Sequence, residues 1–162
     1  MGHAERLMPM IEGVMAEAGL AFADLQRIGV AAGPGTFTGT RIAVSAARAL
    51  ALATGAELVP ITSLRLMAMS PRIPSFPVRR LAIATDARRG EVYLEVFDRF
   101  SLRAVAPAAV IAVADAATAL GPEPIVIAGS GAEALAHHAR EAGIDAMAIL
   151  PDLLPDAFDM LF

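Results

Sequence analysis

The residues best suited to chemistry form a run rich in glycine and threonine, Gly33-Pro34-Gly35-Thr36-Phe37-Thr38-Gly39-Thr40-Arg41. The run follows a short apolar segment and precedes a helical pattern, and backbone N–H groups at such a junction favour an anion. The candidate phosphate loop comprises Gly33, Gly35, Thr36, Thr38 and Gly39. The run has neither the dinucleotide-binding spacing nor a Walker lysine. Its spacing alone favours a structural strand-to-helix turn over phosphate contact and leaves both open.

Two further turns carry polar residues. Gly129-Ser130-Gly131 also joins a short apolar run to a helical pattern, but a lone Gly-x-Gly is more often only a turn. It does not match the Gly-x-Ser-x-Gly nucleophile motif, so it does not support a serine hydrolase. Asp86, Arg88 and Glu91 gather at a predicted hairpin turn. Ordinary turn chemistry is the simpler interpretation, and a turn that faces a cleft is the functional one.

Composition excludes several kinds of site. Cysteine is absent, which rules out disulfides, thiolate metal ligands and cysteine nucleophiles. All 13 basic residues are Arg, so neither a Walker lysine nor a Schiff-base lysine exists. Of the three histidines, His3 stands alone, and His137 and His138 would point about 100° apart on a helix, so no metal site is predicted. The net charge of −4 argues against an autonomous nucleic-acid binder.

The apolar fraction is unusually high. At 56% it exceeds the roughly 45–50% typical of soluble domains, which indicates apolar surface awaiting a partner. Membrane insertion is not expected, because the longest uncharged stretch, 28–40, is interrupted by glycine and proline and is shorter than the roughly 20 residues that a spanning helix needs. The chain opens without a charged-then-apolar signal, so we expect a cytoplasmic protein.

Periodicity predicts two α/β halves. In the first half we expect helices over 4–18, 40–54 and 63–70 and strands over 25–32 and 57–61; in the second half, strands over 78–85, 91–98 and 125–128 and helices over 112–120 and 132–142. The segment 71–77 contains three prolines and is the predicted linker between a lobe at 1–70 and a lobe at 78–162. Both halves contain a strand, a Gly-x-Gly turn and a helix, which suits a duplicated α/β architecture.

The helix expected at 40–54 is apolar on nearly all sides. Arg41, Ser45 and Arg48 form a thin polar stripe, and apolar residues cover most of the rest. Such a helix must be covered on more than one side, whereas its own sheet covers one face. The first helix adds three methionines, which are adaptable side chains suited to an interface. The pattern alone favours a partner surface no more than it favours a deeply buried core helix.

The run 33–41, followed by the apolar helical segment 42–51, resembles the Gly-Pro-Gly-Ser/Thr-Phe-Thr-Gly-x-Arg signature of TsaB (YeaZ-like) proteins. Residues 3–9, 62–64 and 86–93 are similar to that family's first-helix opening, post-strand turn and second-lobe hairpin. These segments lie between residues 3 and 93, and residues 129–131 add a further match. Together they are specific to the family, although any one alone would not be.

This resemblance implies an actin/hexokinase/Hsp70-like (ASKHA) fold of two α/β lobes. It also implies a non-catalytic scaffold subunit of the bacterial machinery that makes tRNA threonylcarbamoyladenosine. Such a subunit docks on and stabilises TsaD, the related glycoprotease-family transferase that modifies adenosine 37 of tRNAs reading ANN codons. A TsaE-like ATPase is the implied third partner, and tRNA is contacted only indirectly. In such proteins the first two helices pack on TsaD, or on a second copy to form a homodimer when TsaD is absent.

The docking face that we expect lies on the first two helices. Its residues are Leu7, Met8, Ile11, Met15, Arg41, Ser45 and Arg48. A bulky charged residue in place of Ala47 or Ser45 is expected to abolish co-purification without unfolding the chain. No catalytic residue and no metal ligand is assigned, since TsaD-like proteins carry paired metal-binding histidines on a helix where this sequence has only His3. We expect no cofactor on this chain alone, and ATP or ADP only in the complex.

The sequence departs from the family pattern at both ends. Family members begin with strands that hold an Asp-Thr-Ser phosphate turn, whereas this sequence opens almost directly at its first helix and stops at Phe162. We therefore expect the first lobe to lack its N-terminal strands, with an open sheet edge, and the C-terminal tail to be cut short.

Two enzyme classes are the alternatives to a scaffold. A metal-dependent glycoprotease-type peptidase is disfavoured by the presence of only three histidines and no paired His motif. An ATP-binding ASKHA-type kinase needs a phosphate-coordinating acid in its first lobe, and the first half of the sequence offers only Asp24 on a predicted surface turn.

Overall fold

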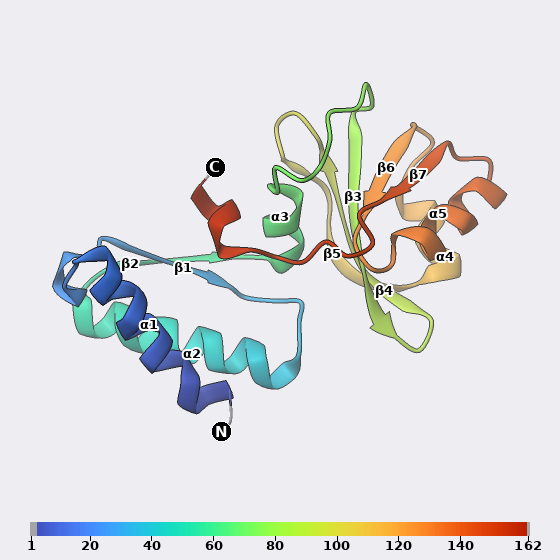
Figure 1. Cartoon of the computed structure of the whole chain (residues 1–162). Coiled ribbons are helices and arrows are strands. Elements are labelled where there is room, and N and C mark those ends of the chain that lie inside the picture. Colours follow the sequence, from blue (N-terminus) through green and yellow to red (C-terminus); the bar gives the residue numbers. More distant parts are fainter. Residues whose placement is uncertain (1–2, 162) are drawn as a thin grey trace. The chain divides into compact units, whose positions relative to one another are not determined.

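The computed structural model describes residues 3–161 and the side chains of residues 5–160. The chain divides into two compact units, 1–63 and 64–162 (Figure 1). This division falls ahead of the segment 71–77 that was expected to link two lobes, and that segment lies within the second unit. His3 opens the first helix, but its side chain lies outside the described residues.

The first unit contains two long helices and a two-stranded sheet. Its elements are α1 (His3–Ala18), the short 3-10 helix η1 (Phe22–Asp24), β1 (Arg27–Ala31), α2 (Phe37–Thr54) and β2 (Glu57–Ile61). The strands are parallel, with Arg27 opposite Glu57 and Ala31 opposite Ile61. The helix α2 packs on both strands and α1 packs on α2. This is the β-α-β arrangement that two parallel strands require.

Local signals explain where α2 begins and ends. The Thr36 side chain accepts a hydrogen bond from the Gly39 N–H and so caps the first turn. At the other end Gly55 has a φ of +77° and its N–H donates to the Ala51 carbonyl, which is a glycine-type C-cap. The helix therefore begins three residues earlier than the apolar periodicity alone predicted.

The first unit buries very little of itself. Among its described residues only Val30, Ala47 and Ser63 are buried. Met10 is 61% exposed and Val14 on α1 is 64% exposed, while Leu52 on α2 is 88% exposed. Helices gain most of their stability from packing an apolar face. The pair α1–α2 therefore presents apolar surface that this unit does not cover.

The second unit contains a mixed five-stranded sheet with helices on its faces. Its elements are α3 (Ser63–Ala68), β3 (Arg80–Arg88), β4 (Glu91–Asp98), β5 (Ala104–Ala112), α4 (Val113–Ala119), β6 (Ile125–Ala128), α5 (Ala132–Glu141), β7 (Ala146–Ile149) and the 3-10 helix η2 (Ala157–Leu161). The strand order is β5-β4-β3-β6-β7. The strands β5, β4 and β3 are antiparallel, and β3, β6 and β7 are parallel.

Apolar side chains cover both faces of this sheet. On one face Leu94 and its neighbours pack with Leu135 of α5 and with α4. On the other face Phe97 packs with Leu64 and Met67 of α3. The alternation predicted for β4 therefore separates two buried layers rather than an apolar face from a solvent-exposed one, and most of the buried residues of the chain lie in this unit.

The segment 71–77 packs on the second unit. The Arg99 guanidinium donates hydrogen bonds to the Phe76 and Pro74 carbonyls, the latter at 3.0 Å. Arg72 forms a 2.9 Å ion pair with Asp152, and the Phe76 ring packs against the core layer that contains Phe97. These contacts hold the segment on the surface of one unit.

Candidate partner interface

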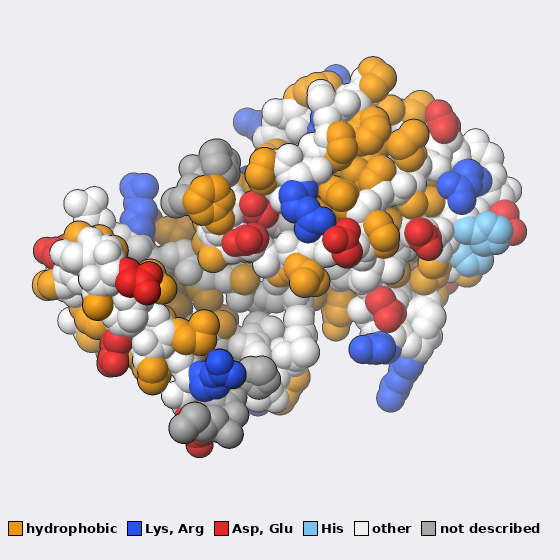
Figure 2. Space-filling model, in the orientation of Figure 1, with side chains coloured by type: hydrophobic (Ala, Val, Ile, Leu, Met, Phe, Trp, Pro, Cys, Tyr) orange, Lys and Arg blue, Asp and Glu red, His pale blue; other side chains and the backbone are white. Residues whose placement is uncertain are grey.

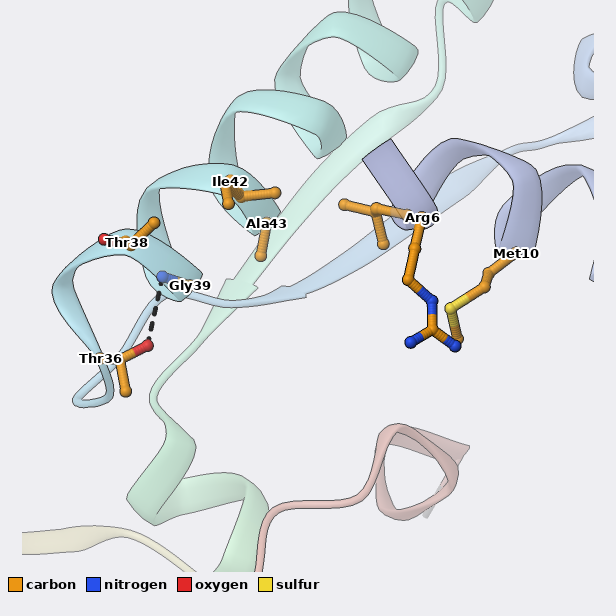
Figure 3. Close-up of a pocket in the computed structure, with 8 residues that line it drawn as sticks. Arg6, Met10, Thr36, Thr38, Gly39, Ile42 and Ala43 are labelled. Carbon is orange, nitrogen blue, oxygen red and sulfur yellow. Dashed lines mark hydrogen bonds between the residues drawn. The ribbon is translucent and has the colours of Figure 1, made fainter. Parts of the chain in front are cut away.

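The helices α1 and α2 pack against each other and leave two hollows along their contact. The first hollow, of about 480 Å³, lies between α1 and the N-terminal end of α2 (Figure 3). The second, of about 360 Å³, lies between α1 and the middle of α2. Leu7 and Ile42 line both hollows. The remaining lining residues are Arg6, Met10, Thr36, Thr38, Gly39 and Ala43 in the first and Met8, Arg41, Ser45 and Ala46 in the second.

The residues expected on the docking face lie on or beside these hollows. Met8, Arg41, Ser45 and Arg48 are exposed, whereas Leu7, Ile11 and Met15 are half-buried. Four of the seven, Leu7, Met8, Arg41 and Ser45, line the second hollow. The structure thus brings part of the predicted set together at one surface.

One expectation about this face is wrong. Ala47 is 6% exposed and is one of the few buried residues of the first unit. A charged side chain there would have to be desolvated inside the unit, so it would disturb the fold as well as any docking. Ser45 is exposed and lines the second hollow, so it remains the position at which a charge tests docking alone.

The arginines of this face have no ion-pair partner among the described residues. The helix α2 contains no acidic residue, and Arg41 and Arg48 form no ion pair with described residues. Arg6 on α1 likewise forms none, and its side chain extends into the first hollow beside Met10 (Figure 3). The Arg41 guanidinium lies over the Phe37 ring, which is itself 70% exposed. A complementary surface would supply carboxylates around an apolar centre.

Sequence reasoning did not place Arg6 or Phe37 on this face, and it noted Met10 only as one of three methionines of the first helix suited to an interface. Arg6 and Met10 share the first hollow with Thr36 and Thr38 only because α1 lies against the N-terminal end of α2. Phe37 had a readable signal, because an aromatic residue four positions before an arginine on a helix places the two side chains on one face.

The candidate phosphate loop is organised mainly as a helix cap. The Thr36 hydroxyl accepts a hydrogen bond from the Gly39 N–H at 3.2 Å, and the Thr36 carbonyl accepts one from the Thr40 N–H at 2.9 Å. A Cβ added at Gly39 would lie 2.6 Å from the Thr36 hydroxyl oxygen, so a side chain there would displace that hydroxyl from its capping position. Gly33 offers its carbonyl to the Ser63 N–H, and Gly35 lies against the Thr40 hydroxyl. Phosphate binding here remains a hypothesis in which Thr38 and Arg6, at the first hollow, are the available contacts.

The turn Gly129-Ser130-Gly131 fastens α5 to β3. Gly129 has a φ of +104°, and a Cβ on it would lie 2.5 Å from the Ala84 carbonyl oxygen. The Gly131 N–H donates to that same oxygen at 2.9 Å. The Ala132 N–H donates to the Gly129 carbonyl. Its glycines are therefore explained by close backbone approach.

The residues Asp86, Arg88 and Glu91 form the β3–β4 turn. The Asp86 carboxylate accepts a hydrogen bond from the Arg88 N–H at 2.8 Å, and the Asp86 N–H donates to the Ser130 hydroxyl at 3.0 Å. Arg88 lies opposite Glu91 in the ladder. Asp86 thus performs ordinary turn chemistry, while the Arg88 side chain is exposed.

Histidines and acids do not gather into a metal-type cluster in the part of the chain that the structure describes. His137 and His138 both approach the Glu141 carboxylate on α5, at 3.4 Å and 3.3 Å. None of the helices described combines the length and apolarity needed to cross a bilayer.

The two units are α/β bodies, and solved structures share this architecture. Over 99% of this chain, a Pseudomonas aeruginosa protein described as similar to peptidase YeaZ aligns with a TM-score of 0.78 and 30% sequence identity, and the match covers 74% of that protein. YeaZ from Pseudomonas aeruginosa aligns with a TM-score of 0.76 and 28% identity. The expected ASKHA-like α/β fold class is confirmed.

The family follows from the sequence match. The family model described as "TsaD: tRNA N6-adenosine threonylcarbamoyltransferase" matches residues 1–149, and the chain belongs to this family. It is 34% identical over 97 residues to the Escherichia coli tRNA threonylcarbamoyladenosine biosynthesis protein TsaB. The aligned region covers 60% of this chain and 42% of that protein. It is 48% identical over 71 residues to a tRNA N6-adenosine threonylcarbamoyltransferase of Erythrobacter litoralis. That aligned region covers 44% of this chain and 21% of the relative. The chain thus matches less than half the length of each of these two relatives.

Proposed function

We propose that this chain is a non-catalytic partner subunit of the machinery that makes threonylcarbamoyladenosine at adenosine 37 of tRNAs reading ANN codons. It docks on a TsaD-like transferase through α1 and α2 and stabilises it. The observation that carries the proposal is the exposure of α1 and α2, which present apolar hollows on a unit with almost no buried core. The names of the Escherichia coli and Erythrobacter litoralis relatives support the pathway.

Exposed apolar helices favour a macromolecular partner over a small substrate. The hollows are shallow features between two helices, and the residues that line them are mainly apolar. Enclosed ligand sites bury most of a small molecule, whereas grooves between helices accept apolar side chains from another helix. A helical face of the transferase is therefore the occupant that we propose.

Charge indicates what that face carries. Arg41 and Arg48 on α2, with Arg6 on α1, form no ion pair with described residues. Carboxylates on the transferase opposite these arginines would give complementary potentials, which favour the right partner and speed association. A second copy of this chain can also supply Glu12 and Glu17 of α1, so a homodimer on the same face is the competing state when the transferase is absent.

The direct test is co-purification with the transferase. Ser45→Glu places a bulky carboxylate beside Arg41 and Ala46 at the second hollow, where it would occupy space needed by the partner, pair with Arg41 and repel the carboxylates proposed on the transferase. We expect Ser45→Glu to lose the transferase, and the matched Ser45→Ala to keep it. Circular dichroism and thermal melting of both variants check that the fold is retained. If Ser45→Glu is folded and still co-purifies with wild-type affinity, this face is not the docking surface.

Function is tested by reconstitution. The chain is added to the transferase, a TsaE-like ATPase, the threonylcarbamoyl-adenylate synthase and tRNA, and modified adenosine is measured. We expect modification to depend on this chain, with ATP or ADP bound in the complex rather than on this chain alone. The same proposal places the chain in the cytoplasm. Protease activity that a chelator abolishes, or tight nucleotide binding by the isolated chain, would instead support the peptidase or the kinase alternative.

A further inference from the structure

We propose that the tip of the β3–β4 hairpin, formed by Arg88 and Arg89 and called here the arginine tip, contacts the phosphate backbone of the tRNA substrate. This inference rests on the proposed function, because that function supplies a tRNA to the complex. It goes beyond the expectation that tRNA is contacted only through the partner. Three independent observations on the second unit carry it: the backbone conformation of the tip, its anchoring, and its unpaired charge.

The backbone of the arginine tip is unusual for its sequence. Arg88, Arg89 and Gly90 have φ values of +70°, +54° and +77°. The two central residues of this hairpin turn are Arg89 and Gly90, where Asn-Gly or Asp-Gly is usual, and Arg88 precedes them at an irregularity in the strand pairing. Two consecutive arginines in the left-handed region therefore cost stability. Residues that keep such a strained backbone at a cost in stability are often functional. We therefore infer a role for the two arginine side chains.

The tip is held rigidly by groups other than its arginine side chains. The Asp86 carboxylate accepts a hydrogen bond from the Arg88 N–H, and the Asp86 N–H donates to the Ser130 hydroxyl. The Gly131 N–H and the Ala84 carbonyl tie the base of the hairpin to the start of α5. The backbone at 88–90 is consequently fixed while both guanidinium groups stay free, so little ordering is required when they bind a ligand.

The charge of the tip is unpaired. Arg88 and Arg89 are exposed and form no ion pair with described residues. Elsewhere on the second unit Arg72, Arg79 and Arg80 each form an ion pair with a carboxylate. Figure 2 shows basic side chains projecting from the end of the second unit where Figure 1 places the β3–β4 turn. The tip is thus a projecting, preorganised pair of cations.

A phosphate backbone is the ligand that such a tip fits best. The planar guanidinium fork matches phosphate oxygens in a bidentate geometry, and a backbone offers consecutive phosphates to neighbouring arginines. The chain as a whole has a net charge of −4, so we expect the contact to be local and sensitive to salt. An acidic protein surface would attract the same cations and is distinguished below.

The test compares two paired variants within the reconstituted complex. In Arg88→Asn/Arg89→Asn the charges are lost, and Asn tolerates the left-handed backbone better than Arg does. The control is Arg103→Asn, which removes an exposed arginine without a described ion pair at the start of β5. The affinity for tRNA is measured across a salt series, and the thermal midpoint of each chain is recorded.

We expect the double variant to bind tRNA roughly tenfold more weakly at about 50 mM salt, with a salt slope lowered by about 1 for each arginine removed. The thermal midpoint of the chain should rise by a few degrees, because strain is relieved. Arg103→Asn should change neither tRNA affinity nor slope. This combination of a more stable chain and weaker tRNA binding is not expected of a merely structural turn.

Two results would overturn the arginine tip. One is an unchanged tRNA affinity and salt slope in the double variant. The other is a loss of transferase binding by the double variant with tRNA affinity otherwise intact, since that outcome assigns the tip to an acidic protein surface. Titration of the isolated wild-type and variant chains with tRNA at low salt gives a readout that does not need the transferase. Failure of the wild-type chain to bind the transferase would contradict the proposed function. The titration would then decide the role of the arginine tip alone: weaker tRNA binding by the double variant would support it, and equal binding would contradict it.

Discussion

The Arg41 guanidinium carbon lies 3.7 Å from the centroid of the Phe37 ring, one turn earlier on α2. Phe37 is largely exposed, so the pair forms a solvent-facing cation–π stack at the start of the helix. The stack holds the Arg41 side chain along the rim of the second hollow. A large aromatic surface and an ordered cation at an interface are typical of residues that contribute strongly to binding.

Phe37→Ala should therefore weaken transferase binding without unfolding the chain. We expect a roughly tenfold loss of affinity, because the variant removes the aromatic surface and frees Arg41 to rotate. Isothermal titration against the transferase measures the loss. Phe100→Ala is the matched control, since Phe100 is equally exposed but belongs to the second unit. Equal affinities for the Phe37 and Phe100 variants would exclude the stack from the interface.

The close approach of Gly129 to Ala84 predicts an intolerant position. Gly129→Ala combines a φ of +104° with a Cβ only 2.5 Å from the Ala84 carbonyl oxygen, so we expect a loss of about 3 kcal/mol or more in unfolding free energy. Gly143 also has a positive φ, +81°, but its added Cβ would meet no atom within 4 Å, so Gly143→Ala should cost only about 1 kcal/mol. Urea denaturation of both variants separates crowding from backbone strain. Similar losses would mean that the contact with Ala84 has little weight.

Asp98 gives the second unit an acid-sensitive anchor. The hydrogen bond from Arg79 at 2.6 Å, helped by those from the Ser101 N–H and hydroxyl, holds the pKa of the Asp98 carboxyl well below its usual range. A carboxyl whose pKa is lowered on folding stabilises the folded state above its unfolded pKa of about 4, and that stability is lost as pH falls towards the folded pKa.

Asp98→Asn should therefore lower the thermal midpoint at neutral pH and flatten its fall below about pH 4. The measurement is a series of melting curves from pH 7 down to pH 2. Asp115→Asn, an exposed position on α4, is the comparison. If the thermal midpoint falls by the same number of degrees in the wild type and in Asp98→Asn across this range, the ion pair of Asp98 does not stabilise the fold.

Arg99 predicts how the segment 71–77 is kept in place. Its guanidinium donates to the Pro74 and Phe76 carbonyls, so Arg99→Gln should leave these groups to water and loosen the segment. Limited proteolysis should cut the variant within 71–77 several times faster than the wild type, because cleavage follows local opening. Arg103→Gln, four residues away, should be cut at the wild-type rate. Protection equal to that of the wild type would show that core packing of Phe76 is sufficient.

Sequence periodicity was most successful where packing repeats a simple pattern. The strands β2, β4 and β6 have the predicted limits, because each is a short apolar or alternating run between turn residues. The strand β5 was missed, since Ala-Val-Ala-Pro-Ala-Ala-Val-Ile-Ala contains proline and much alanine, a residue that strands disfavour. The short strand β7 was missed for the same reason, as two of its four residues are alanine.

The candidate interface was only partly visible in the sequence. The apolar character of α2 indicated a need for cover, and Ser45 and Arg41 followed from its polar stripe. Ala47 was misjudged, because helical spacing alone does not say which small residue of an apolar helix is buried. The hollows depend on where α1 crosses α2, which the sequence of neither helix determines alone.

The sparse interior of the first unit links assembly to turnover. Only Val30, Ala47 and Ser63 are hidden from water among its described residues, so whatever binds α1 and α2 adds its binding free energy to the stability of that unit. On the function proposed above, a copy without its transferase would open at this end first and reach proteases sooner. Surplus subunits would then be cleared, and the ratio of the two proteins would correct itself without any dedicated regulator.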